Sequence, residues 1–103
     1  MSPHPATTPS ALHFRDMTLN VGQLQHWLPG AAGDQPCQIT ADYARFGTET
    51  RGVTVTWEPL PLLNIGRLSL PRLRVCFAIQ GLTAEEEQRF WQCFERAFSR
   101  GGG

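Results

Sequence analysis

Hydrophobic and polar residues alternate along several stretches of the chain, a pattern that predicts half-buried β-strands. The clearest stretch is VTVTWEP at 53–59, in which valine and tryptophan alternate with threonine and glutamate. CQITADYARF, at 37–46, alternates from Cys37 to Tyr43 and is predicted to be one strand. A further strand is predicted in RLSLPRLRVCFAIQG, at 67–81, with one face formed by Leu73, Val75, Phe77 and Ile79.

The first apolar stretch, ALHFRDMTLNV at 11–21, changes phase along its length. Leu12 and Phe14 have one parity, whereas the apolar residues from Met17 onward have the other. One extra residue in a strand moves every following side chain to the opposite face. We therefore predict a strand with a β-bulge near residues 15–16, which would bring both sets of apolar side chains to one face.

The stretch PLPLLNIG at 59–66 is apolar but interrupted by prolines, which favours a sheet edge or a corner. Its end, NIG, is predicted to be a three-residue hairpin loop in which Gly66 adopts a positive φ. Pro71 indicates that the strand after this loop begins at an edge or with a bulge.

Two stretches have the periodicity of amphipathic helices. In NVGQLQHWLPG, at 20–30, Asn20 and Gln23 have capping-box spacing, and a Pro-Gly pair ends the predicted helix. In the second stretch, 83–100, Thr83 and Glu86 have capping-box spacing, and three glutamates lie in the first turn, where the helix dipole favours them. Its apolar stripe consists of Phe90, Phe94, Ala97 and Phe98.

The order strand, short helix, three strands and long helix predicts an α+β domain. We expect a four-stranded antiparallel meander, either strongly curved or barrel-like, with the C-terminal amphipathic helix on one face and a short helix after the first strand. Residues 1–10 are rich in proline and are expected to be a disordered tail. Residues 11–100 would form the single domain, and 101–103 a flexible glycine tail.

Composition restricts the classes of function. The 103 residues carry nine basic and nine acidic side chains, so the formal net charge is zero. A nucleic-acid-binding domain usually has a net positive charge, so we regard nucleic acid as an improbable partner, whereas neutrality permits self-association. No stretch has the roughly 18 apolar residues of a membrane span, and the N-terminus lacks the pattern of a signal peptide. We expect a cytoplasmic, bacterial-type protein without a membrane partner.

Catalytic and metal-binding signatures are absent from the sequence. Three widely spaced cysteines are typical of reduced thiols, and together with the histidines they lack metal-ligand spacing. We therefore expect no cofactor, no metal and no catalytic residue. The alternative is a nucleophile assembled in space from a histidine and one of two cysteines, Cys76 or Cys93.

Two candidate binding surfaces follow from the pattern. The first is a set of three arginines in an acid-free stretch, Arg67, Arg72 and Arg74, which can bind a small anion or a nucleotide. Its alternative is a solvated sheet face whose arginines pair with acids across strands. The second surface is apolar and comprises Trp27, Leu60, Leu62, Leu63 and Trp91. For Trp91, which lies beside the phenylalanine stripe, the alternative is a place in the core.

The stretch LRVCFAIQGLTAEEEQRFWQCFERAF at 73–98 resembles the end of a PilZ domain, in which a final strand runs into G-L-x-x-E-E and a helix closes a barrel. The ligand-binding signatures of that family, an N-terminal R-x-x-x-R and a D/N-x-S-x-x-G, are absent here. Cyclic-dinucleotide binding therefore does not follow from the resemblance. The terminal RGGG resembles the end of ubiquitin-like proteins, but a predicted helix leads into it, so we interpret Gly101 as a helix C-cap.

These observations predict a small, non-catalytic interaction domain that forms a homodimer or binds another protein. The alternative is a degenerate PilZ-like module that senses a small anion or nucleotide through its strand arginines.

Overall fold

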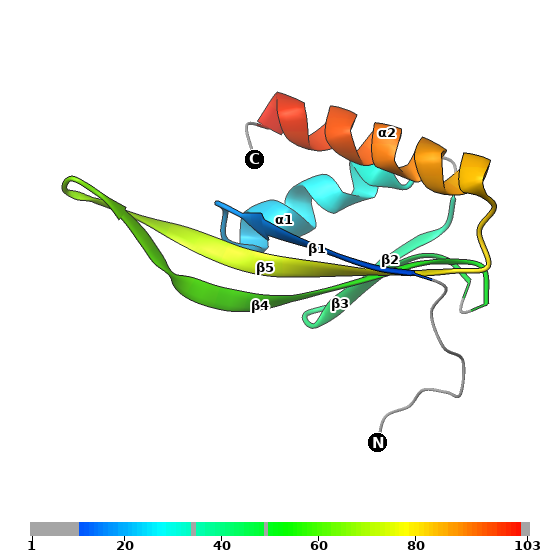
Figure 1. Ribbon diagram of the computed structural model, residues 1–103, viewed down its shortest axis with the longest axis horizontal. Helices are drawn as coiled ribbons and strands as arrows, with labels where there is room; N and C mark the ends of the chain where they lie inside the picture. Colours follow the sequence, from blue (N-terminus) through cyan, green and yellow to red (C-terminus); the bar gives the residue numbers. More distant parts are fainter. Residues whose placement is uncertain (1–10, 34, 49, 102–103) are drawn as a thin grey trace, which may run out of the picture.

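The computed structural model describes residues 11–33, 35–48 and 50–101 (Figure 1). Five strands form one open antiparallel sheet in the order β1-β5-β4-β3-β2. Along the chain they are β1 (Ala11–Met17), β2 (Cys37–Ile39), β3 (Tyr43–Gly47), β4 (Gly52–Ile65) and β5 (Leu68–Gln80). The α+β class and the antiparallel sheet are confirmed, whereas the predicted four strands and the barrel-like alternative are wrong.

The additional strand arises because the predicted strand at 37–46 is a hairpin. The hydroxyl of Thr40 accepts hydrogen bonds from the backbone N–H groups of Asp42 and Tyr43, each at 3.1 Å. A side chain that satisfies backbone donors in this way stabilises a turn in place of a strand ladder. The chain therefore reverses at residues 40–42, and Ile39 of β2 lies opposite Ala44 of β3.

The predicted bulge in the first strand is also wrong. β1 pairs with β5 without interruption, from Ala11 opposite Ile79 to Met17 opposite Leu73. Leu12 and Phe14 consequently remain on the face that is away from the helices. The prediction assumed that all large apolar side chains of the strand are buried, but the exposed fraction of Phe14 is 61%.

Three helical segments cover the other face of the sheet (Figure 1). These are α1 (Val21–Trp27), the 3-10 helix η1 (Leu28–Ala31) and α2 (Ala84–Gly101). Both predicted capping boxes are confirmed. Asn20 and Gln23 exchange side chain-to-backbone hydrogen bonds of 2.8 and 2.9 Å, and Thr83 and Glu86 exchange bonds of 3.1 and 2.9 Å.

The hydrophobic core lies between these helices and the central strands. The phenylalanines of α2 are buried as predicted, and so is the alternating set of β5. Phe94 stacks on Phe98 at a centroid distance of 4.4 Å and meets Phe77 of β5 edge to face at 5.1 Å. This aromatic layer joins the helix to the middle of the sheet.

β4 and β5 extend beyond their neighbours as a two-stranded projection (Figure 1). The outer pairing of β5 ends at Leu73, opposite Met17, and that of β4 ends at Thr56, opposite Tyr43. We call residues 60–71 the arm. Its tip is a two-residue turn rather than the predicted three-residue loop, and the predicted positive φ of Gly66 is confirmed at 60°.

Replacement of Phe94 by alanine tests the aromatic layer. We expect Phe94→Ala to lower the free energy of unfolding by about 3–5 kcal/mol, because it removes a buried ring that α2 and β5 share. Gln92→Ala, at an exposed position of the same helix, should change it by less than about 0.5 kcal/mol. Chemical denaturation measures both values, and equal effects of the two variants would contradict this account of the core.

Candidate functional site

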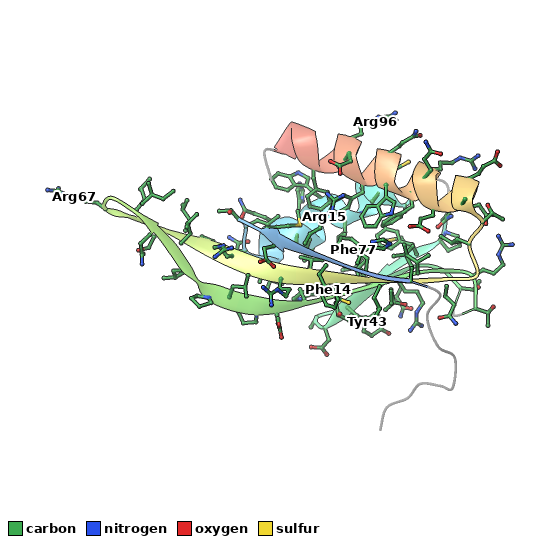
Figure 2. All side chains as sticks on the ribbon, viewed as in Figure 1. Phe14, Arg15, Tyr43, Arg67, Phe77 and Arg96 are labelled. Atoms are coloured by element: carbon green, nitrogen blue, oxygen red, sulfur yellow. The ribbon has the colours of Figure 1, made fainter. Side chains whose placement is uncertain are left out.

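The face of the sheet opposite the helices is uncovered. Side chains alternate between the two faces, so Phe14 and Tyr43 point away from the helices while Arg15 and Phe77 point toward them (Figure 2). Register places Phe14 of β1 beside Cys76 of β5, and the same row continues to Tyr43 of β3. We call this surface the open face.

A shallow depression of about 280 Å³ lies on the open face. Its lining combines apolar, sulfur-containing and charged groups, from Phe14, Thr56, Trp57, Glu58, Arg74 and Cys76. A second cavity, of about 230 Å³, lies between η1 and the first turns of α2. Its lining includes Cys93, Glu86 and Arg89. Both depressions are therefore lined in part by charged side chains.

Two of the three predicted anion-binding arginines converge on one carboxylate. Arg74 donates two hydrogen bonds to Asp16, with Nε–Oδ1 at 2.8 Å and Nη2–Oδ2 at 3.1 Å. Arg72 Nη2 lies 3.9 Å from the same Oδ2 atom. Arg67 is at the tip of the arm, away from this cluster (Figure 2). The structure thus brings Arg72 and Arg74 together, but around the carboxylate of Asp16 in the same chain.

The electrostatics of this cluster follow from the bidentate contact. Hydrogen bonds from Arg74 lower the pKa of Asp16 below its ordinary value. Asp16 in turn raises the pKa of Arg74. Sequence reasoning missed Asp16 because its place opposite Arg74 depends on the register of strands that are 58 residues apart.

The predicted apolar leucines lie on the arm. Leu62, Ile65 and Leu68 are between 55% and 60% exposed, and the remaining aliphatic residues of the arm are half-buried. Cross-strand pairs place most of these side chains on one side of the ribbon, namely Leu60, Leu63, Ile65, Leu68 and Leu70. On the opposite side Ser69 Oγ lies 2.8 Å from Asn64 Oδ1. The arm therefore has an aliphatic face, which these five residues define.

The two candidate tryptophans lie at the margin of the core, and both are half-buried. Trp91 meets Phe77 edge to face at 4.9 Å, and the guanidinium of Arg15 lies 4.8 Å from its ring centre. Trp27 contacts Phe98 at 6.2 Å. The structure does not bring either tryptophan onto the aliphatic face of the arm.

The cysteines occupy three separate places. Cys37 is exposed on β2, Cys76 lies on the open face and Cys93 lies on α2. Burial raises the pKa values of Cys37 and Cys76, whereas an activated nucleophile requires a lowered pKa. Among the described residues, no three His, Cys, Asp or Glu side chains are arranged to hold a metal ion.

Comparison with protein-family models, curated proteins and solved structures finds no match to this chain. Within the described part of the chain, none of the helices combines the length and the apolar character needed to cross a membrane.

The pairing of Asp16 with Arg74 predicts a specific pH dependence. Because the folded-state pKa of Asp16 is lowered, the pair stabilises the fold above the unfolded-state pKa, about 3.9, and this contribution is lost as pH falls through the folded-state value. The urea midpoint of Asp16→Asn should therefore lie below that of the wild type at neutral pH, and the two should converge in acid. High salt should reduce the difference.

Nuclear magnetic resonance of the carboxyl carbons measures the same effect directly. Asp16 should titrate below its ordinary pKa of 3.8 in the wild type. The midpoint should rise toward that value in Arg74→Gln, which keeps an N–H donor but removes the charge. A wild-type midpoint at or above 3.8 would show that the contact with Arg74 does not stabilise the ionised acid.

Proposed function

We propose that this protein is a non-catalytic interaction domain that binds another protein through the aliphatic face of its arm. The observation that supports this most directly is the accumulation of five aliphatic residues on one face of an element that covers none of the core. Two of them are more than half exposed: Ile65 and Leu68.

The arm is poorly explained as a structural element. Beyond Leu73 and Thr56 its strands pair only with each other, and an isolated two-stranded hairpin is at best marginally stable in water. When a partner covers aliphatic side chains that are exposed to water on such a ribbon, the free energy falls by about 25 cal/mol per Å² of apolar surface buried. A contiguous exposed apolar surface is typical of an interaction site.

The chemistry of the arm restricts its partner. Arg67 is the only charged residue between 60 and 71, so the arm offers a strongly charged partner surface few ion pairs. Pro61 and Pro71 cannot donate backbone hydrogen bonds, which disfavours addition of a strand along the arm. The partner that fits presents an apolar groove. The depressions described on this chain carry charged linings, so we favour a groove on a different protein over one on a second copy.

Anion sensing through Arg67, Arg72 and Arg74 has no comparable support. Two of these arginines share the carboxylate of Asp16, and the third is at the arm tip. An incoming phosphate would compete with an intramolecular acid that is held in place by the β1–β5 ladder.

Site-specific photo-crosslinking in the cells that produce the protein tests the proposal. A photoreactive residue at position 68, on the arm, should give a discrete adduct that mass spectrometry identifies. The same residue at position 92, exposed on α2, is the matched control and should not give this adduct. The identified protein is then purified, and its affinity for the chain is measured.

Leu63→Ser combined with Leu68→Ser should weaken that affinity at least tenfold, because interface centres depend on a few apolar contacts. The urea midpoint should change little, since neither residue belongs to the buried core. Unchanged affinity in the double variant, or adducts that do not differ between positions 68 and 92, would overturn the proposed function.

A further inference from the structure

The free edges of the sheet differ in how they are protected, and backbone hydrogen bonding shows which groups each edge offers. Thr48 N–H donates to Arg51 C=O at 2.9 Å at the β3–β4 turn. Backbone groups of successive residues in an antiparallel strand point to alternate sides. The backbone N–H and C=O groups of odd-numbered residues of β4 therefore point toward β3, and those of even-numbered residues point toward β5.

The register carries this alternation across the sheet to β1. Thr56 lies opposite Cys76, so even-numbered residues of β5 bond to β4 and odd-numbered residues bond to β1. Arg15 lies opposite Val75, so the odd-numbered residues of β1 use their backbone groups within the sheet. The backbone N–H and C=O groups of Leu12, Phe14 and Asp16 point to the free edge.

The prolines agree with this alternation and protect the other edges. Pro59 of β4 and Pro71 of β5 are odd-numbered, so their nitrogens face outward, where no ladder bond is lost. β1 ends at Met17 because the next bonded pair would require an N–H from Pro71. The opposite edge of the sheet, β2, has only three residues and follows Pro36. Among the described strands, β1 alone combines a long free edge with the absence of proline.

β1 also shows the features of a strand that is covered in an assembly. It is seven residues long, lacks a bulge, and exposes 54% of Leu12 and 61% of Phe14. Regular edge strands with exposed apolar side chains readily pair with another chain, and natural proteins normally block them. Prolines protect the edges of the arm and of β2, whereas the edge of β1 is unprotected. This difference indicates that β1 pairs with a specific strand.

We propose that this strand is β1 of a second copy, which pairs antiparallel about a two-fold axis at Phe14 and joins the two sheets into one. This axis is the one that pairs all three outward-facing residues: Phe14 meets its own equivalent, and Leu12 meets Asp16. Ala11 then lies opposite Met17, which matches two apolar side chains on the helix side. Such a contact is isologous, as in most homodimers.

Charges around β1 fit a second copy. Within one copy Arg15 Nη1 lies 2.8 Å from Glu95 Oε2, and His13 Nε2 lies 3.2 Å from Glu87 Oε2. In this register Arg15 lies opposite His13 of the other copy, so the arginine also approaches the second copy's Glu87 carboxylate. Trp91 contacts both His13 and Arg15, so the same interface covers part of its remaining exposed surface. A net charge of zero adds no repulsion between copies.

This inference concerns the β1 edge and does not rest on the arm or on its partner. Analytical ultracentrifugation at high micromolar concentration should give twice the monomer mass of 11.5 kDa. Phe14→Glu and Phe14→Lys each place like charges opposite each other at the axis, and each variant alone should sediment as a monomer. An equimolar mixture should restore the dimer, because glutamate then meets lysine.

Two matched variants separate this interface from other modes of self-association. Tyr43→Glu changes an aromatic residue of the same open face away from the edge, and Leu68→Ser changes the arm; both should remain dimeric. Amide hydrogen exchange adds a residue-level readout. Leu12, Phe14 and Asp16 amides should exchange slowly in the wild type and quickly in Phe14→Glu, while the amides of His13 and Arg15 stay protected in both.

A monomeric wild type at high micromolar concentration would overturn the inference and leave the proposed arm function standing. A dimer that persists in Phe14→Glu would also overturn it. Dissociation of the dimer by Leu68→Ser would overturn it as well, because self-association would then depend on the arm. Rapid exchange of the Leu12, Phe14 and Asp16 amides in a wild-type dimer would place the interface elsewhere.

Discussion

The packing of α2 onto one face of the sheet is the interaction on which the rest of the structure depends. Phe90 and Phe94 meet the ring of Phe77, Phe98 stacks on Phe94, and together they close the core on that side. In the described part of the chain, the long helix α2 and the short segments α1 and η1 all lie on this face (Figure 1). One helical layer can bury only one face of a sheet, so the other face and the arm stay exposed to solvent.

The positions of the prolines determine which edges of this one-sided sheet can accept a further strand. A sheet with an uncovered face, two lateral edges and a projecting ribbon offers many routes to uncontrolled strand addition. Pro59, Pro61 and Pro71 remove donors from the ribbon, and Pro36 limits β2. The arm therefore exposes mainly side chains, whereas β1 keeps its outward backbone groups available for pairing. The two exposed apolar regions thus differ in the groups that they offer to another molecule.

The candidate site was only partly predictable from the sequence. The arginines of β5 and the leucines of the arm were identified because the composition of residues 59–82 is unusual: it is apolar, rich in proline and free of acids. Asp16 was not identified, since pairing with Arg74 requires the β1–β5 register. Phe14 was predicted to share a face with Met17, because the sequence does not show which face of its strand the helices will cover.

Local chemistry, taken from the sequence by itself, determined the α+β class, both capping boxes, the alternating faces of β4 and β5 and the positive φ of Gly66. The class follows from the order of the elements, and each of the other features depends on residues within a few positions of one another. Tertiary structure alone decided the number of strands, the edge position of β1, the projection of the arm and the pairing of Asp16 with Arg74. These features depend on which strands pair and where each neighbour ends, and hydrophobic periodicity does not encode contacts between residues that are distant in sequence.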